Sequence, residues 1–256
     1  MLEEHFINKE VLLQNQNSWD TMADTWFGST ALPVYGCLAP TEAQLKLFPD
    51  LGDKKVLDIG CGSGHSLKWC GENGASELWG IDISTKQIQN ADKYLAENGY
   101  KATLSVSPME EMETLPKNYF DVIYSIYALG WTVDLPKTIK NISDCLKRGG
   151  TLIFSWDHPL MHCVTARDQK IYLEGCNYLS DDMVSFELRG NPVTIQSRKM
   201  STWINTLAEE NFKIEKVIEE TSQDVLEKEY EFSESYYAPS RAKVMPLSFI
   251  VKATKM

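Results

Sequence analysis

The stretch VLDIGCGSG, residues 56–64, decides the fold of this chain. Its apolar first half, 56–59, predicts a buried strand, and three glycines at alternate positions predict a tight turn leading into a helix that starts near His65. Glycine has no Cβ and adopts positive φ, so a ligand can approach the backbone of such a turn closely. Open α/β sheets bind ligands at this place, beyond the carboxyl end of a strand. We therefore expect an α/β fold with a ligand site at residues 60–64.

This turn lacks the features of a phosphate site. It has no Gly-Lys-Ser/Thr ending, and His65 stands where the dinucleotide fingerprint has its third glycine. Asp58, at the end of the strand, would repel a pyrophosphate and attract a cationic group such as an amine or a sulfonium. The pattern favours a cationic ligand, with a nicotinamide-dependent oxidoreductase as the weaker alternative.

A carboxylate belongs to the second apolar run, LWGIDI at residues 78–83. Asp82 lies 22 residues beyond Gly60, close to the spacing at which an acidic residue accepts hydrogen bonds from a ribose diol. Alone, Asp82 would indicate only a loop carboxylate. Together with the glycine turn, it predicts a ligand that contains a ribose.

The two motifs resemble the first and second motifs of class I S-adenosylmethionine-dependent methyltransferases, and the resemblance extends over residues 40–256. It implies S-adenosyl-L-methionine as the cofactor, with S-adenosyl-L-homocysteine as its product. It also implies a doubly wound, Rossmann-like α/β sheet of seven strands in the order 3-2-1-4-5-7-6, with strand 7 antiparallel. The residue pattern places these strands at 56–59, 78–83, 101–106, 119–129, 151–156, 212–219 and 246–253.

Polar residues and glycines predict where several helices begin and end. Asn17-Ser18 is expected to start a helix near the N-terminus, and Ser84 and Ser201-Thr202 to start those at 85–98 and 201–211. Lys147-Arg148-Gly149-Gly150 is expected to end the helix at 134–146. We expect a single domain, residues 1–256, with a helical cap (1–48), a cofactor-binding half (52–157), a substrate-lid insertion (158–200) and the C-terminal part of the sheet (201–256).

The composition is that of a globular protein with an acidic balance. Hydrophobic residues make up 43% of the chain, enough for a core, and the formal net charge is −11. Nucleic-acid binding needs a basic face, so nucleic acid is not the expected partner. No apolar run approaches the ~20 residues of a membrane span, and the first residues show no signal pattern. Six cysteines without CxxC spacing predict reduced thiols, no metal site and a cytoplasmic protein.

The resemblance assigns roles to residues at the expected cofactor site. It implies that the backbone of Gly60, Cys61 and Gly62 approaches the methionine part and the ribose, and that Asp58 offsets the cofactor's amino group. It likewise implies that Asp82 accepts from the ribose hydroxyls and that Ile83 packs on the adenine. Two further sets follow: Pro108 and Met109 in the adenine loop, where the family commonly has an acidic and then a small residue, and Ser125, Ile126 and Tyr127 beneath the methionine end.

Aromatic residues and one histidine are the candidates for the acceptor side. Trp19 and Trp26 lie on one stripe of the N-terminal helix, which indicates either core packing or a flap over the site. Tyr127 is a further candidate substrate contact. His158 is the candidate general base and substrate residue, because imidazole titrates near neutral pH, although a histidine before a proline often only caps a strand end. His162 is a weaker candidate base.

These residues predict a methyltransferase that acts on a small, partly apolar molecule, because aromatic-lined sites suit such acceptors. A protein or peptide methyltransferase is an alternative, since an acidic surface could attract a basic tail. A non-catalytic cofactor-binding subunit is another. The methyl acceptor, its accepting atom (O, N, S or C), the need for a general base and the oligomeric state stay open.

Overall fold

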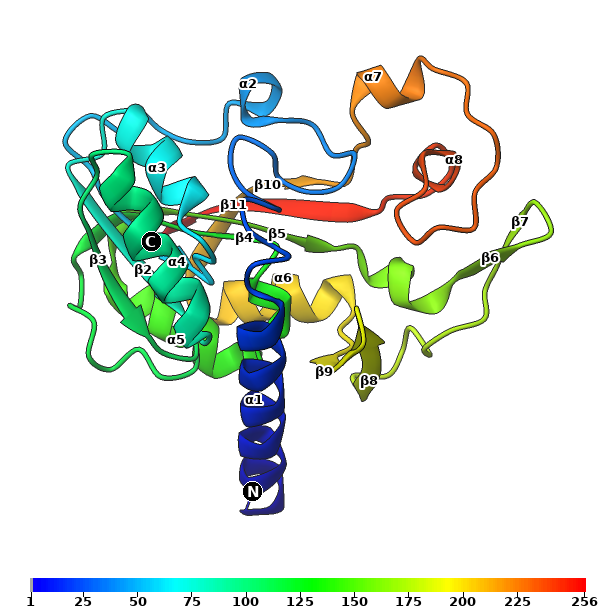
Figure 1. Cartoon of the computed structure of the whole chain (residues 1–256), viewed down its shortest axis with the longest axis horizontal. Coiled ribbons are helices and arrows are strands. Elements are labelled where there is room, and N and C mark those ends of the chain that lie inside the picture. Colours follow the sequence, from blue (N-terminus) through cyan, green and yellow to red (C-terminus); the bar gives the residue numbers. More distant parts are fainter. Residues whose placement is uncertain (1) are drawn as a thin grey trace.

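A mixed sheet of seven strands forms the centre of the molecule in the computed structural model, which describes residues 2–256, with side chains from residue 8 onward (Figure 1). The strand order is β10-β11-β5-β4-β1-β2-β3, and β11 is antiparallel to both of its neighbours. This confirms the predicted order. The strands are β1 (Lys55–Ile59), β2 (Glu77–Asp82), β3 (Ala102–Val106), β4 (Phe120–Ile126), β5 (Leu146–Asp157), β10 (Phe212–Ile218) and β11 (Ser248–Lys255).

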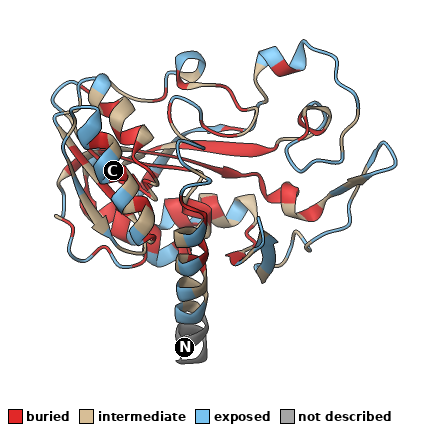
Figure 2. Cartoon of the chain, in the orientation of Figure 1, coloured by how far each residue is buried: buried red, intermediate tan, exposed pale blue. Residues whose placement is uncertain are grey.

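Both faces of the sheet are buried, because successive side chains of a strand point to opposite faces. Val56 belongs to one hydrophobic core and Leu57 to the other. Helices α3 (His65–Glu72) and α4 (Thr85–Glu97) supply buried side chains to the first core, and α5 (Leu135–Cys145) and α6 (Met200–Glu209) to the second. Figure 2 shows the resulting concentration of buried residues in the central strands. Parallel strands covered in this way read as continuous apolar runs, and that is why they were predictable.

Helix boundaries agree with the expected caps at some places and differ at others. Ser84 Oγ accepts a hydrogen bond from Gln87 N at the start of α4, as predicted. The end of α5, at Cys145, agrees with the prediction, but the expected glycine cap is wrong: Lys147–Gly150 lie within β5, which begins directly after Cys145. Between two consecutive pairings, β4 advances two residues and β5 five, so these residues form an irregularity in the strand. Similarly, Ser201-Thr202 lie inside α6, whose N-cap position is held by Lys199 without a side-chain hydrogen bond.

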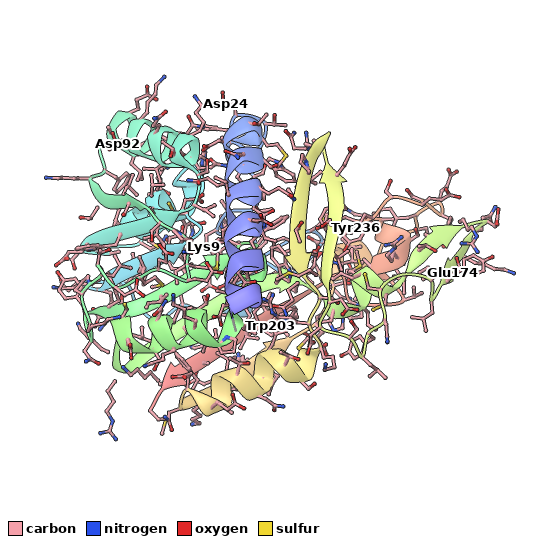
Figure 3. The ribbon with its side chains drawn as sticks, turned by 90° about the horizontal axis from the view of Figure 1, so that it is seen from below. Lys9, Asp24, Asp92, Glu174, Trp203 and Tyr236 are labelled. Carbon is pink, nitrogen blue, oxygen red and sulfur yellow. The ribbon has the colours of Figure 1, made fainter. Side chains whose placement is uncertain are left out.

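The N-terminal helix α1 runs without interruption from Leu2 to Met22, so the prediction that Asn17-Ser18 starts a helix is wrong. Ser18 Oγ instead donates to Pro192 O, a contact with a distant part of the chain. In Figure 3, α1 lies between α4 and the hairpin formed by β8 (Met183–Leu188) and β9 (Asn191–Gln196). The helix therefore contacts both α4 and the β8–β9 hairpin, next to the carboxyl ends of the central strands.

The remaining elements are short. The segment expected as an insertion holds two hairpins, β8–β9 and β6–β7 (Thr165–Arg167 and Lys170–Tyr172). The other short elements are α2 (Glu42–Leu45), η1 (Leu129–Trp131), η2 (Pro159–Cys163), α7 (Gln223–Leu226) and α8 (Pro239–Ala242). All six cysteines are free. Among residues 2–256, no helix combines the length and the apolar character needed to cross a membrane.

Candidate functional site

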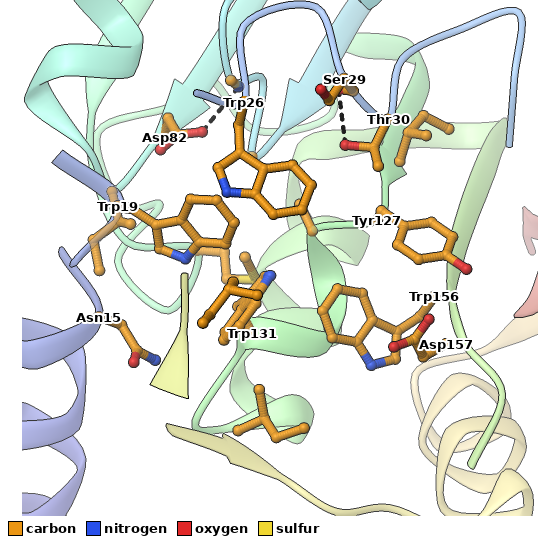
Figure 4. Close-up of a pocket in the computed structure, with 18 of the residues that line it drawn as sticks. Asn15, Trp19, Trp26, Ser29, Thr30, Asp82, Tyr127, Trp131, Trp156 and Asp157 are labelled. Carbon is orange, nitrogen blue, oxygen red and sulfur yellow. Dashed lines mark hydrogen bonds between the residues drawn. The ribbon is translucent and has the colours of Figure 1, made fainter. Parts of the chain in front are cut away.

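A cavity of about 710 Å³ lies at the carboxyl ends of β1, β2, β4 and β5 (Figure 4). Its floor comes from the glycine turn, the ends of β2 and β4, and the loop after β3. Its cover comes from α1, the segment that follows α1, and the β8–β9 hairpin. A volume in this range is typical of small-molecule sites. The position agrees with the one predicted from the glycine turn.

The glycine turn leaves an open hollow in the wall of this cavity. Gly60 N and Cys61 N both donate to Ile81 O, at 2.8 and 2.9 Å, which ties the turn to β2. Gly60 has φ +72°, and a Cβ there would lie 2.2 Å from the Cβ of Ala128. Gly62 also has positive φ, but a Cβ there would meet no atom within 4 Å. The backbone at Gly62 therefore faces free space, as a backbone site for a ligand requires.

Asp82 is held in place beside this hollow. Its Oδ2 accepts from Gly62 N and its Oδ1 from Ser84 N, both at 2.9 Å. A carboxylate oxygen has capacity for more than one hydrogen bond, so both oxygens can accept again. Burial raises the pKa of Asp82 to about 6, against the two backbone N–H groups, which lower it. Burial, reinforced by the negative charge of Asp82, also raises the pKa of the neighbouring Asp58.

The described lining of the cavity contains four acidic side chains and neither lysine nor arginine. Asp58, Asp82, Glu110 and Asp157 line it, whereas none of its described lining residues is a lysine or an arginine. Phosphate and carboxylate ligands are usually bound by such cations. The lining thus favours a ligand with positive charge, in agreement with the expectation from Asp58.

Glu110 was not predicted, because the resemblance implies an acidic residue at the positions of Pro108 and Met109 instead. All three residues line the cavity. Glu110 Oε1 accepts from Thr132 Oγ1 at 2.6 Å and from Val133 N at 2.7 Å, while Oε2 has no partner. The acid therefore comes one residue after Met109. The only sequence signal would have been the carboxylate immediately following the expected pair.

Five aromatic rings form a continuous wall across the cavity, and we call Trp26, Trp19, Trp131, Trp156 and Tyr127 the aromatic wall (Figure 4). Successive ring centroids along this series lie 6.0, 5.2, 5.6 and 5.8 Å apart. Trp19 and Trp26 therefore face the cavity, which favours the flap interpretation over plain core packing. The indole Nε1 of Trp26 is buried without a hydrogen-bond partner. Such a donor suits a site with one polar end.

Tyr127 has an unusual backbone, and its neighbour Ser125 lies elsewhere than expected. Tyr127 has φ +54°, in the left-handed region that costs a bulky residue free energy. Its N–H donates to Ser155 O at 3.1 Å, and its ring occupies the place that a Cβ at Gly36 would take. Ser125 does not line the cavity, because its Oγ donates to Ile59 O at 2.8 Å inside the sheet. Of the three residues expected beneath the methionine end, only Ile126 and Tyr127 line the cavity.

His158, the predicted base, lies outside the lining of the cavity. Its Nδ1 accepts from Leu160 N at 3.2 Å, and its Nε2 donates to Glu219 Oε1 at 2.6 Å. Both ring nitrogens are engaged, and His158 caps η2, a structural role at the start of a helix in place of the strand-end cap that was the alternative to catalysis. His162 does line the cavity, and burial lowers its pKa to about 4, so its imidazole is neutral at pH 7.

Asp157, the residue before His158, lies in the cavity wall, where His158 was expected. Asp157 ends β5 and lines the cavity. Tyr237 OH donates to both of its oxygens, at 2.9 and 3.0 Å, and Tyr236 OH to Oδ2 at 3.4 Å. Burial raises the pKa of Asp157 to about 6, in opposition to the tyrosine hydroxyls. Nothing in the sequence indicated this cluster, because about 80 residues separate Asp157 from the two tyrosines.

Hydrogen bonds join the parts of the cover to each other and to the floor of the cavity. Asn15 Nδ2 donates to Thr194 O at 2.7 Å, and Thr194 N donates to Asn15 Oδ1 at 2.9 Å. On the other side, Asp20 Oδ1 accepts from Ser84 Oγ and Lys86 N at the start of α4. Gly28 N donates to Ser63 Oγ in the glycine turn. The cover is therefore connected to the floor of the cavity at several points.

Comparisons with known proteins agree with this geometry. Residues 57–154 match the family model described as "Methyltransferase domain". An uncharacterized protein of Haemophilus influenzae is 32% identical over 224 residues, covering 83% of this chain and 85% of that protein. A putative S-adenosylmethionine-dependent methyltransferase of Listeria monocytogenes has the same fold, with a TM-score of 0.69, 24% identity and coverage of 84% of this chain and 97% of its own.

Two further relatives carry a specific activity in their names. The ubiquinone biosynthesis O-methyltransferase of Nitrosospira multiformis is 31% identical over 41% of this chain and 44% of its own length. Phosphoethanolamine N-methyltransferase 3 of Arabidopsis thaliana is 28% identical over 73% of this chain and 39% of its own length. The chain thus spans less than half the length of each of these two relatives.

Proposed function

The chain belongs to the class I S-adenosylmethionine-dependent methyltransferases, and we propose that its methyl acceptor is a small, partly apolar molecule bound against the aromatic wall. The observation that carries this proposal is the shape of the cavity. It continues from Gly62 and Asp82 to Trp156 and Asp157, so one continuous space has a cofactor end and an acceptor end.

The residues at the cofactor end fit S-adenosylmethionine. The free space at Gly62 admits a ligand to the backbone, and Asp82 retains acceptor capacity for a ribose diol. Asp58 places negative charge near this end, which suits the amino group and the sulfonium. The expected positions, Pro108 and Met109, hold no carboxylate for the adenine amine. Glu110, next to Met109, provides one.

The bound sulfonium supplies a methyl group that is already activated for transfer. The chain itself has to exclude water and hold the acceptor in line. The cover formed by α1 and the β8–β9 hairpin serves the first task, and the aromatic wall the second. Tyr127, held with positive φ against Gly36, fixes one end of that wall. His158 has no part in this arrangement, because its ring nitrogens are engaged elsewhere.

Named relatives support a small acceptor without fixing its accepting atom. Their names specify O-methylation in ubiquinone biosynthesis and N-methylation of phosphoethanolamine. A protein tail would need an open groove, whereas this cavity lies beneath a fastened cover. A subunit without activity would be expected to have its acceptor end filled by side chains, but here that end is free.

The test is to titrate S-adenosylmethionine into wild-type protein and into Asp82→Ala by calorimetry. We expect wild-type binding and a loss of about tenfold or more in Asp82→Ala, since a buried, hydrogen-bonded carboxylate contributes ~1.4 kcal/mol or more. Asp92→Ala, on the exposed side of α4, is the matched control and should bind normally. A screen of small metabolites and of a protein extract with methyl-labelled cofactor then identifies the acceptor class. Label that enters only protein would contradict the proposal.

A further inference from the structure

The acceptor end of the cavity holds a buried carboxylate without a cationic partner. Asp157 is only 7% exposed. Its hydrogen bonds come from the hydroxyls of Tyr236 and Tyr237, which are neutral donors, and among the described residues it forms no ion pair. A buried charge that is only partly compensated costs free energy, so retaining one inside a ligand cavity calls for an explanation.

This carboxylate is distinct from the ones at the cofactor end. Asp157 ends β5 and Asp82 ends β2, and β1 and β4 lie between these two strands. Neighbouring strands are about 4.8 Å apart, so the two strand ends are separated by roughly 14 Å across the sheet. In Figure 4 the two carboxylates lie at opposite ends of the aromatic wall, Asp82 near Trp26 and Asp157 near Trp156. Asp157 therefore faces the acceptor rather than the ribose.

Aromatic rings surround Asp157. Trp156 is the preceding residue, and its ring lies 5.8 Å from that of Tyr127. The rings of Tyr236 and Tyr237 are 4.8 Å apart and nearly perpendicular, and both line the cavity. Aromatic faces attract cations, and a quaternary ammonium is bound by a set of such rings. A carboxylate among aromatic rings combines charge attraction with a surface for the apolar part of an alkylammonium.

We propose that Asp157, with Trp156, Tyr127, Tyr236 and Tyr237, binds a protonated amine or quaternary ammonium group of the methyl acceptor. This inference rests on the proposed function, because it names the chemical class of the acceptor for the same cavity. It concerns recognition of the acceptor and holds whichever atom of the acceptor is methylated.

An anionic acceptor does not fit the same surroundings. A phosphate or carboxylate group would meet Asp157 with no lysine or arginine among the described residues of the lining. Arg241 is buried, and its Cζ lies 5.7 Å from the ring of Tyr236, but it neither lines the cavity nor pairs with Asp157. The negative charges of such a group and of Asp157 would repel each other. Phosphorylated acceptors are therefore excluded from the class that we propose.

The experiment compares two probes of equal shape, choline and its neutral isostere 3,3-dimethylbutan-1-ol. Each is titrated into the full-length protein saturated with S-adenosylhomocysteine, and tryptophan fluorescence reports binding, because four tryptophans belong to the aromatic wall. We expect choline to bind about tenfold or more tightly than the isostere, from charge and cation–π attraction. In Asp157→Asn, which keeps the shape of the side chain, this preference should disappear.

Asp168→Asn is the matched control, because it removes the same charge from an exposed turn between β6 and β7. It should keep the preference for choline. Equal binding of the two probes to wild-type protein, or no saturable choline binding, would overturn the proposal even if Asp157→Asn did not fold. Binding of S-adenosylhomocysteine is measured in the same samples. Its failure would count against the proposed function itself, whereas normal cofactor binding without a preference for choline would refute only the ammonium site.

Discussion

Gly62 and Gly99 are two residues with the same local geometry and different surroundings. Both have positive φ, at +51° and +79°, and a Cβ on either would meet no atom within 4 Å. Gly62 lines the cavity, whereas Gly99 follows the end of α4 and does not. An alanine at either position would therefore incur a similar backbone cost, about 1–2 kcal/mol. Only at Gly62 would the added methyl group occupy space that belongs to a ligand.

We predict that Gly62→Ala and Gly99→Ala lower the free energy of unfolding by comparable amounts, and that only Gly62→Ala weakens cofactor binding, by about tenfold or ~1.4 kcal/mol. Chemical denaturation gives the first quantity, and calorimetric titration with S-adenosylhomocysteine the second. Gly99→Ala serves as the control for strain. Unchanged cofactor affinity in a folded Gly62→Ala protein would show that the hollow at the glycine turn is not where the cofactor contacts the backbone.

At the scale of elements, α1 acts as a fastened cover, and Asn15 is one of its connections to the β8–β9 hairpin, together with Ser18. Asn15 is 2% exposed, and its side chain makes two hydrogen bonds with the backbone of Thr194. Removing a partner leaves buried polar groups unsatisfied, at a cost of about 1–3 kcal/mol. Because β8 and β9 pair only with each other in the described structure, the hairpin relies on α1 for part of its attachment.

We predict that Asn15→Ala increases amide hydrogen exchange in residues 183–196 more than in the central strands, with a loss of about 1–3 kcal/mol in the free energy of unfolding. Hydrogen exchange read by mass spectrometry measures the local effect. Thr21→Ala, an exposed residue of the same helix whose hydroxyl bonds only to Asn17 O, should leave exchange unchanged. Equal exchange in the hairpin of wild-type and Asn15→Ala protein would mean that Asn15 does not hold the hairpin in place.

The elements also show what the sequence can and cannot reveal. The central strands and the glycine turn were predictable, because apolar runs and glycines are local signals of burial and of positive φ. The helix start predicted at Asn17-Ser18 is wrong, because a polar pair can either cap a helix or, as Ser18 does, bond to a distant carbonyl. The Asp157 cluster was not predictable, because it depends on Tyr236 and Tyr237, which only the tertiary fold brings to β5.

For the whole molecule, the acidic cavity adds a cost to folding. Asp82 and Asp157 are carboxylates whose pKa burial raises to about 6, and the pKa of Asp58 is raised in the same direction. The chain as a whole also carries a formal net charge of −11. Such groups lower the stability of the empty protein at neutral pH. A cationic ligand would relieve this cost, which links binding to stability.

Asp157→Asn should therefore change the dependence of stability on pH. The pKa of Asp157 is about 6 in the folded protein and 3.8 in the reference state. Between these values the folded state binds more protons than the unfolded state, so the free energy of unfolding falls as pH rises through this window, by about 3 kcal/mol in total. Asparagine does not titrate, so the variant escapes this loss. Relative to wild type, Asp157→Asn should gain roughly half of that amount between pH 5 and pH 8, measured by chemical denaturation.

Asp168→Asn, which removes an exposed charge, should run parallel to wild type. A difference in the free energy of unfolding between Asp157→Asn and wild type that stays constant with pH would mean that Asp157 is already compensated in the folded protein. A cation at this site would then have no energetic basis.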